Sequence, residues 1–180
     1  MSAQPRVEAI ESAAIGAILP RLCEILVDCV ADGASVGFLM PFDRERARGY
    51  WRGVERAVRA GRCVLLVARA DGALPLGTVQ LDLDTLPNQR HRATVSKLLV
   101  DPAFRRRGVG EALMRAAEDA ARDDGRWLLT LDTATDAARR LYERTGWTLA
   151  GAIPRYAQNP DGTFTQTWIY WKTLAGSPDR

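Results

Sequence analysis

The part of this sequence best suited to bind a ligand runs from Leu98 to Gly110, where an apolar segment passes through a short turn into a helical pattern. Gly108 and Gly110 lie at the turn, and glycine lets the backbone approach a ligand because it has no side chain. The first N–H groups of a helix have no partner within it and carry the positive end of the helix dipole. The sequence therefore predicts an anion site formed by main-chain N–H groups, of the kind that binds phosphate or pyrophosphate.

The common nucleotide-binding glycine motifs do not match this turn. A Walker loop needs Gly-Lys-Ser/Thr, which does not follow this turn. A dinucleotide fingerprint needs a third glycine and an acidic residue at a set distance beyond it, and the turn lacks both. The alternative is that Arg105, Arg106 and Arg107 form a solvated charged run and the glycines only make a turn. The strand-like segment before the turn and the amphipathic pattern after it favour the anion site.

The segments around the turn predict how it is held. From Val109 to Ala120, apolar residues recur at helical spacing with charged residues on the opposite side, which predicts an amphipathic helix. Three apolar segments before the turn predict an antiparallel meander, and the strand after the helix predicts a parallel pairing with a crossover. The expected segments, in chain order, are a strand at 7–10, a helical region whose second part is 20–31, a loop at 33–42, a helix at 43–61, strands at 64–68, 76–83 and 94–100, the helix after Gly108, a strand at 127–131, a helix at 136–144, and strands at 147–153 and 164–172.

Proline, glycine and aspartate positions predict the ends of these segments. Pro20 is expected to begin the second part of the first helical region, because proline is favoured at the first position of a helix. Asp43 is expected to cap the next helix. Asp71-Gly72 and the sequence from Asn159 to Gly162 are typical of turns, so the strands on either side of each are expected to pair as hairpins.

Length and composition indicate one folded domain over residues 1–180. A chain of 180 residues is long enough for one well-buried core but too short for two ordinary domains. A formal net charge of +3 suits an anionic ligand but falls short of the concentrated basic face that duplex binding needs, so no nucleic-acid partner is expected. Residues 1–10 carry Arg6 and Glu8 and have no long apolar run, so neither a signal peptide nor a membrane span is expected, and no membrane partner.

The cysteine and histidine content argues against a metal site and against cysteine catalysis. Cys23, Cys29 and Cys63 form no metal-type pair, and their odd number argues against a disulfide framework, which favours a cytoplasmic protein without a bound metal. His91 is the only histidine and is expected to be a solvated loop residue. An acyl-enzyme mechanism would need it beside a cysteine, so direct transfer is preferred.

The turn and a later segment resemble two motifs of the GNAT (Gcn5-related N-acetyltransferase) superfamily. Arg105, Gly108 and Gly110 match motif A, Arg/Gln-x-x-Gly-x-Gly/Ala, after a strand that ends with Leu98-Leu99-Val100. The segment from 135 to 147 resembles motif B, commonly Asn-x-x-Ala-x-x-Leu/Phe-Tyr followed by Gly-Phe. The matching residues there are Ala138, Leu141, Tyr142 and Gly146, while Thr135 stands for the Asn and Trp147 for the Phe. The resemblance covers the chain from about Val64 onward.

This resemblance implies a GNAT fold of the α/β (α+β) class, a mixed and mostly antiparallel sheet of about seven strands flanked by about four helices. It also implies acetyl-CoA as cosubstrate and no metal. The pyrophosphate would lie on the turn and the pantetheine along the preceding strand, with an N–H near Leu99 meeting the thioester carbonyl. The residues expected to bind acetyl-CoA are Leu98, Leu99, Val100, Arg105, Arg106, Arg107, Gly108, Val109, Gly110, Glu111 and Thr135.

Two residues are predicted to move protons. The resemblance makes Tyr142 the general acid that protonates the departing CoA thiolate, and the alternative is that its ring only packs at a helix interface. Asp132 follows a buried strand at its carboxyl end, where open α/β sites place polar groups, so it is the candidate base. The alternative is that Asp132 caps the following turn and that a water chain carries the proton.

Further strings resemble the tabtoxin (wildfire toxin) resistance acetyltransferases, namely residues 33–38, 154–156, 160–162 and 169–174. This likeness implies a small-molecule primary amine as acceptor, a toxin or antibiotic such as tabtoxinine-β-lactam, which attacks directly. Tyr50, Trp51, the loop at 35–42 and Tyr156 are candidates for the acceptor wall, with core packing the alternative for Tyr50 and the preferred role for Trp51. Alternative functions are a protein N-terminal or lysine acetyltransferase and a non-catalytic CoA-binding protein. The resemblance also allows a homodimer, which has no signature in this sequence.

Overall fold

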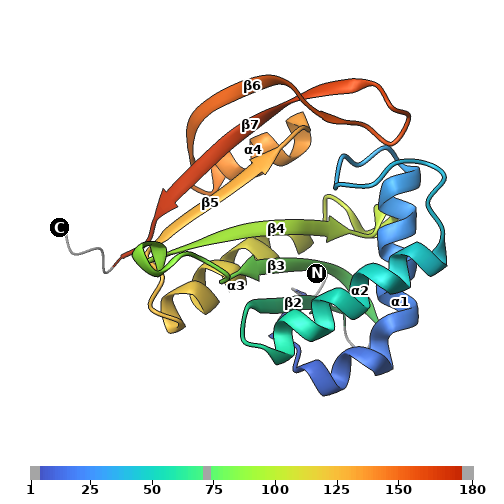
Figure 1. Cartoon of the computed structure of the whole chain (residues 1–180), viewed down its shortest axis with the longest axis horizontal. Helices are drawn as coiled ribbons and strands as arrows, with labels where there is room; N and C mark the ends of the chain where they lie inside the picture. The colour runs from blue at the N-terminus through green and yellow to red at the C-terminus, as the bar shows by residue number, and fades with distance from the viewer. Residues whose placement is uncertain (1–4, 71–73, 176–180) are drawn as a thin grey trace.

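A computed structural model of the chain describes residues 5–70 and 74–175. Within these residues lies a seven-stranded sheet in the order β1-β2-β3-β4-β5-β7-β6, with helices on both of its faces (Figure 1). The strands are β1 Arg6–Ala9, β2 Cys63–Arg69, β3 Pro75–Asp82, β4 Arg92–Val100, β5 Leu128–Thr133, β6 Thr148–Gln158 and β7 Phe164–Thr173. The α-helices are α1 Ser12–Ala31, α2 Arg44–Arg59, α3 Val109–Asp123 and α4 Asp136–Arg144.

The alternation of side chains along β2 divides the core into two clusters. Leu65 and Val67 pack with α1 and α2 on one face of the sheet, whereas Leu66 and Ala68 pack with α3 on the other. Successive residues of a strand point to opposite faces, so one apolar strand supplies both clusters. Trp51 of α2 is 0% exposed in the first cluster, which confirms its predicted packing role. Figure 1 shows α1 and α2 on the near side of the sheet and α3 behind it.

The sheet opens between its two central strands. β4 and β5 are the only parallel pair among the described strands, as the crossover through α3 predicts, and all other neighbouring strands are antiparallel. Their register covers only the three pairs from Arg92–Leu128 to Thr94–Thr130, and beyond these the strands diverge (Figure 1). A bulge lies next to the point of divergence, since Lys97 and Leu98 of β4 both lie opposite Val79 of β3. A bulge bends its strand, so it accounts for the divergence.

Caps fix the ends of the helices near this opening. The side chain of Asp43 accepts a hydrogen bond from Arg46 N at 2.9 Å, as predicted, and Thr135 caps α4 by accepting from Ala138 N at 3.3 Å. Gly108 is the N-cap of α3 with φ of 80°, a left-handed conformation that favours glycine. The chain therefore enters α3 through a backbone geometry that its sequence permits.

The expected segments match the observed elements within a few residues, with one correction. Pro20 does not begin a helix, because α1 runs unbroken from Ser12 to Ala31 with this proline inside it. Proline removes one helical N–H, but Ile15, Leu22 and Leu26 are buried against the sheet, and this packing outweighs the local preference. The expected turn at Asp71-Gly72 lies outside the described residues. No helix in the described parts of the chain is long and apolar enough to cross a membrane.

Candidate active site

The opening between β4 and β5 leads into a cleft of about 1000 Å³. Its walls come from the loop between α1 and α2, the second half of β4, the start of α3, the end of β5, α4 and β6. A volume of this size is large enough for a cofactor-sized ligand. The cleft therefore lies where the pairing of β4 with β5 stops, so the edges of these two strands that face each other are unpaired there.

The start of α3 presents main-chain donors to this cleft. Gly108, Val109, Gly110 and Glu111 all line it, and none of their N–H groups donates to an acceptor within the described residues. These groups are the unpaired donors of a helix N-terminus, and together with the helix dipole they favour an anion. A Cβ on Gly110 would lie 3.3 Å from Leu141 Cδ2, so glycine lets α4 pack closely here. The arrangement fits a phosphate or pyrophosphate group.

Two ion pairs tie the turn before α3 to α1. Arg105 pairs with Asp32 and its Nε donates to Val100 O at 3.4 Å, so its guanidinium is already engaged by the protein. Arg21 pairs with Asp101, which is only 7% exposed and also accepts from Ala103 N at 2.8 Å. A buried carboxylate needs such partners. The Arg21–Asp101 pair was not predicted from the sequence, because the two residues lie 80 positions apart.

The structure brings nearly all of the predicted cofactor residues to the cleft. Leu98, Leu99 and Val100 line it from β4, and Arg105, Arg106 and Thr135 also line it, together with the four residues at the start of α3. Arg107 is the exception: it is not among the lining residues, and its guanidinium lies over the Phe104 ring at 5.4 Å from the centroid. The hydroxyl of Thr135 is used as the α4 cap, and the carboxylate of Glu111 pairs with Arg115 and Arg144.

Tyr142 lies in the wall of the cleft and is only 5% exposed. Its ring packs near those of Trp147 and Tyr170, at centroid distances of 6.1 and 5.9 Å. Its hydroxyl makes no hydrogen bond to any other described residue, although the neighbouring Tyr170 hydroxyl donates to Glu143 at 2.7 Å. Burial raises the pKa of Tyr142, and the negative charge of Asp132 raises it further. The phenol therefore stays protonated at neutral pH and keeps a free donor at the cleft.

Asp132 lines the same cleft from the end of β5. Its Oδ2 accepts a hydrogen bond from Thr167 Oγ1 of β7 at 3.0 Å. No backbone N–H of the following turn donates to Asp132 within the described residues, and Thr135 N donates to Thr133 Oγ1 at 3.4 Å instead, so the structure gives no support to a capping role for Asp132. The side chain of Asp132 is exposed, and its second oxygen accepts no hydrogen bond from the described residues. A carboxylate held in this way can accept a proton within the cleft.

Lys97 is a cleft residue that the sequence did not single out. It belongs to the bulge of β4 and has φ of 52°, which is unusual for a residue with a side chain. Its Nζ lies 5.8 Å from the centroid of the Tyr50 ring and 3.8 Å from the position that a Cβ would take on Gly37. Burial lowers the pKa of Lys97, and the charge of Asp132 opposes that shift. A bulge depends on strand register, so local sequence gave no signal for it.

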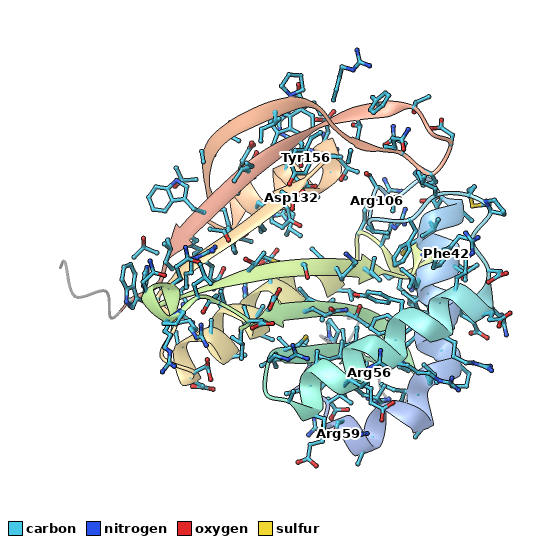
Figure 2. All side chains as sticks on the ribbon, viewed as in Figure 1. Phe42, Arg56, Arg59, Arg106, Asp132 and Tyr156 are labelled. Carbon is cyan, nitrogen blue, oxygen red and sulfur yellow. The ribbon has the colours of Figure 1, made fainter. Side chains whose placement is uncertain are left out.

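The predicted acceptor-wall residues divide between cleft and core. Residues 35–39 of the loop and Tyr156 of β6 line the cleft, whereas Phe42 is buried in the core. Tyr50 supports the wall from behind, because its hydroxyl is 2.7 Å from Gln80 Nε2 and its ring contacts Phe38. Figure 2 shows Asp132 near the end of β5 with Tyr156 above it, and Arg106 across from them beside the α1–α2 loop.

The cysteines and His91 are placed apart from any shared chemistry. All three cysteines are buried, and burial raises the pKa of Cys29, which lines the cleft and lies 3.5 Å from Val100 O. His91 is not a lining residue and is not freely solvated as expected, because it stacks on Trp127 at 4.7 Å between ring centroids. The described residues contain no group of three or more His, Cys, Asp or Glu side chains that could hold a metal ion.

Comparison with known proteins gives matches over most of the chain. Residues 21–147 match the acetyltransferase (GNAT) family. An Azospirillum brasilense protein, described as an uncharacterized N-acetyltransferase in the hisH-hisA intergenic region, is 32% identical over 163 residues, which is 89% of each chain. The crystal structure of a Brucella melitensis ribosomal-protein-alanine N-acetyltransferase has a TM-score of 0.77 at 22% identity and covers 94% of this chain and 99% of its own. The structure of yncA, a putative acetyltransferase from Salmonella typhimurium with its cofactor acetyl-CoA, has a TM-score of 0.76 at 19% identity. The match covers 96% of this chain and 95% of the yncA chain.

Proposed function

This chain belongs to the GNAT family of acetyl-CoA-dependent N-acetyltransferases, and we propose that it acetylates a primary amine of a small molecule by direct attack on the thioester. The main support for the proposal is the row of unpaired N–H groups from Gly108 to Glu111, which lies at one wall of the cleft. Tyr142, whose hydroxyl has no hydrogen-bond partner among the described residues, lies in another wall of the same cleft. A single cleft thus offers a pyrophosphate site and a proton donor.

The proposed cofactor site uses main-chain groups for the anion and β4 for the pantetheine arm. The N–H groups at the start of α3 would bind the pyrophosphate, and the divergent half of β4 would pair with the arm as an added strand does. The ion pairs of Arg105 with Asp32 and of Arg21 with Asp101 would hold the turn in its binding geometry before the cofactor arrives.

The proposed chemistry uses one side chain that accepts a proton and another that donates a proton. Asp132 would accept a proton from the acceptor amine as the new nitrogen–carbon bond forms. Tyr142 would give its proton to the sulfur as the carbon–sulfur bond breaks, and its raised pKa keeps that proton in place beforehand. Acetyl-CoA supplies the activated acetyl group, and the products are the acetylated amine and CoA.

The proposed acceptor follows from the resemblance of the loop strings to the tabtoxin resistance acetyltransferases, which suggests an amino-acid-like toxin such as tabtoxinine-β-lactam. Residues 35–38 of the first of these strings and Tyr156 of another line the cleft, which supports an acceptor role for them. The alternative acceptor is a protein N-terminus or lysine, and the structural likeness to a ribosomal-protein-alanine N-acetyltransferase is the observation that favours it. The cytoplasmic location remains a prediction from cysteine usage.

The test has a binding step and a transfer step. Acetyl-CoA at about 100 times its dissociation constant should stabilise the protein against thermal unfolding by roughly 2.7 kcal/mol. Release of free CoA thiol is then measured with a panel of amino acids, aminoglycosides, polyamines and peptides with free N-termini or lysines. CoA without the acetyl group serves as the control, because it should stabilise the fold and release no additional thiol.

The outcomes separate the alternatives. Transfer to small amines supports the proposal, and transfer to peptides alone favours the protein acetyltransferase. Stabilisation by acetyl-CoA without transfer to any amine would indicate a non-catalytic CoA-binding protein and contradict the proposal.

A further inference from the structure

Two opposite charges flank the opening of the cleft without touching each other. Thr94–Thr130 is the last register pair between β4 and β5, and Lys97 and Asp132 follow three and two residues later on these parallel strands. Both line the cleft, and no ion pair joins them. The two side chains thus stand on opposite walls, just beyond the point where the strands part.

Lys97 has no anionic partner in the described residues. Its Nζ forms no hydrogen bond or ion pair there. The interaction that it does make is a cation–π contact with the Tyr50 ring, at 5.8 Å from the ring centroid. It is half-buried, and burial lowers its pKa. A half-buried ammonium normally finds a carboxylate or carbonyl partner, because desolvation of an unpaired charge is costly. An anionic ligand beside Lys97 would therefore offset the desolvation cost of its unpaired ammonium.

The backbone at Lys97 also departs from ordinary strand geometry. Its φ of 52° is the left-handed region, where a residue with a side chain is strained. Thr78 Oγ1 donates to Lys97 O at 3.4 Å and so supports the bulge from β3. Strain of this kind persists where the surrounding structure imposes it, and it gathers at ligand sites. The bulge directs the lysine under the α1–α2 loop, beside Gly37.

We propose that Lys97 is the specificity residue of the acceptor site and binds a carboxylate that the acceptor carries next to its reactive amine. The inference rests on the proposed function and narrows its substrate class to amino acids and amino-acid-like compounds. Asp132 faces the amine of such an acceptor and Lys97 faces its carboxylate, so the charges on the two walls complement those of a zwitterion. The Tyr50 ring holds the ammonium group in position from behind.

The test compares each acceptor with its own carboxamide. Steady-state thiol release is measured for L-amino acids and for the corresponding amino acid amides, which keep the amine and side chain but lose the negative charge. Wild type should favour the acid over the amide by at least about tenfold in kcat/KM. Lys97→Met should lower kcat/KM for the acid by roughly tenfold to a hundredfold, mainly through KM, and leave the amide nearly unchanged.

Two further variants act as controls. Lys97→Arg keeps the positive charge and should retain most of the preference for the acid. Arg140→Met removes another cleft-lining cation, on α4, and should leave the ratio of acid to amide unchanged. Thermal stabilisation by acetyl-CoA should persist in all three variants, which establishes that they fold and bind the cofactor.

The results distinguish this inference from the proposed function. If amines are acetylated but acids and amides react equally well in wild type, or if Lys97→Met slows both to the same extent, Lys97 does not read a carboxylate. If acetyl-CoA binds and no amine in the panel is acetylated, both the proposed function and this inference are wrong.

Discussion

Two regions of the cleft are built from different kinds of chemical group. The N–H turn, residues 105–111, offers main-chain donors from one continuous stretch of chain. The acceptor region, formed by Lys97, Asp132, Tyr142 and Tyr156, offers side chains from two strands of the opened sheet, a helix and an outer strand. In the proposed cofactor site the first region binds the pyrophosphate, a group common to all CoA thioesters, whereas the chemistry of the second region can change with a single side chain.

Specificity for the acceptor therefore depends on the side chains of the acceptor region. Main-chain donors at a helix N-terminus are fixed by the backbone and are little affected by which side chains surround them. The charges of Lys97 and Asp132, in contrast, each come from one side chain that lines the cleft. We therefore expect side-chain changes in the N–H turn to have large effects only where they add bulk or negative charge beside the anion site, and the acceptor region to be sensitive to the removal of single side chains.

The largest effect is expected from Tyr142→Phe. This change removes the hydroxyl that is free at the cleft and leaves the buried ring in place, so kcat should fall by roughly 10²- to 10⁴-fold while the stabilisation by acetyl-CoA is unchanged. The measurement is steady-state thiol release together with thermal unfolding. Tyr170→Phe is the matched control, since that hydroxyl is bonded to Glu143, and it should retain most of the rate. An unaltered kcat in Tyr142→Phe would remove this residue from the chemistry.

The next largest effect is expected from Gly108→Glu. A Cβ at Gly108 meets no atom within 4 Å, although the left-handed backbone there strains any side chain, and the Glu carboxylate would stand beside the anion site. The variant should lose the roughly 2.7 kcal/mol of stabilisation that saturating acetyl-CoA provides. Gly108→Ala carries the same left-handed backbone strain without the charge. The Ala variant should keep a clear response to acetyl-CoA, and equal loss in both variants would attribute the effect to the backbone alone.

A smaller effect, of opposite sign, is expected on stability in Lys97→Met. The pKa of Lys97 is lowered below its ordinary 10.5 in the folded state, so the protonated form opposes folding at neutral pH. Without ligand, this variant should unfold at a higher temperature than wild type, because methionine carries no charge to desolvate. The gain should shrink as the pH rises through the lowered pKa toward 10.5, where wild-type lysine also becomes neutral. Lys97→Arg keeps the charge and should give no such gain. If Lys97→Met instead unfolds at a lower temperature than wild type, the charge of Lys97 does not destabilise the ligand-free protein.

The smallest effect is expected from Arg107→Ala. Its guanidinium lies over Phe104 and outside the cleft, so the affinity for acetyl-CoA should change by less than about threefold. Arg106→Ala is the comparison, since Arg106 lines the cleft and should lose more affinity. Titration of acetyl-CoA by thermal shift measures both variants. A larger loss in Arg107→Ala than in Arg106→Ala would mean that the turn changes shape when the cofactor binds.

The sequence predicted the fold and the N–H turn well because both depend on local patterns. The amphipathic α3 follows from a period of 3.6 residues, and the strands follow from short apolar segments of the sequence. Pro20 shows the limit of such reasoning, since the helix it interrupts is held by tertiary packing. His91 shows another, because its stacking on Trp127 joins residues 36 positions apart in the chain.

The sequence alone was enough to predict that a strand enters a helix through a glycine turn with unpaired N–H groups. The bulge at Lys97, the ion pair of Arg105 with Asp32 and the hydrogen bond that Thr167 donates to Asp132 follow from the tertiary structure. The physical reason is the range of the interactions involved. Hydrogen bonds at a helix N-terminus are made by neighbours in the chain, whereas the register of β4 and the contacts across the cleft depend on how distant segments pack.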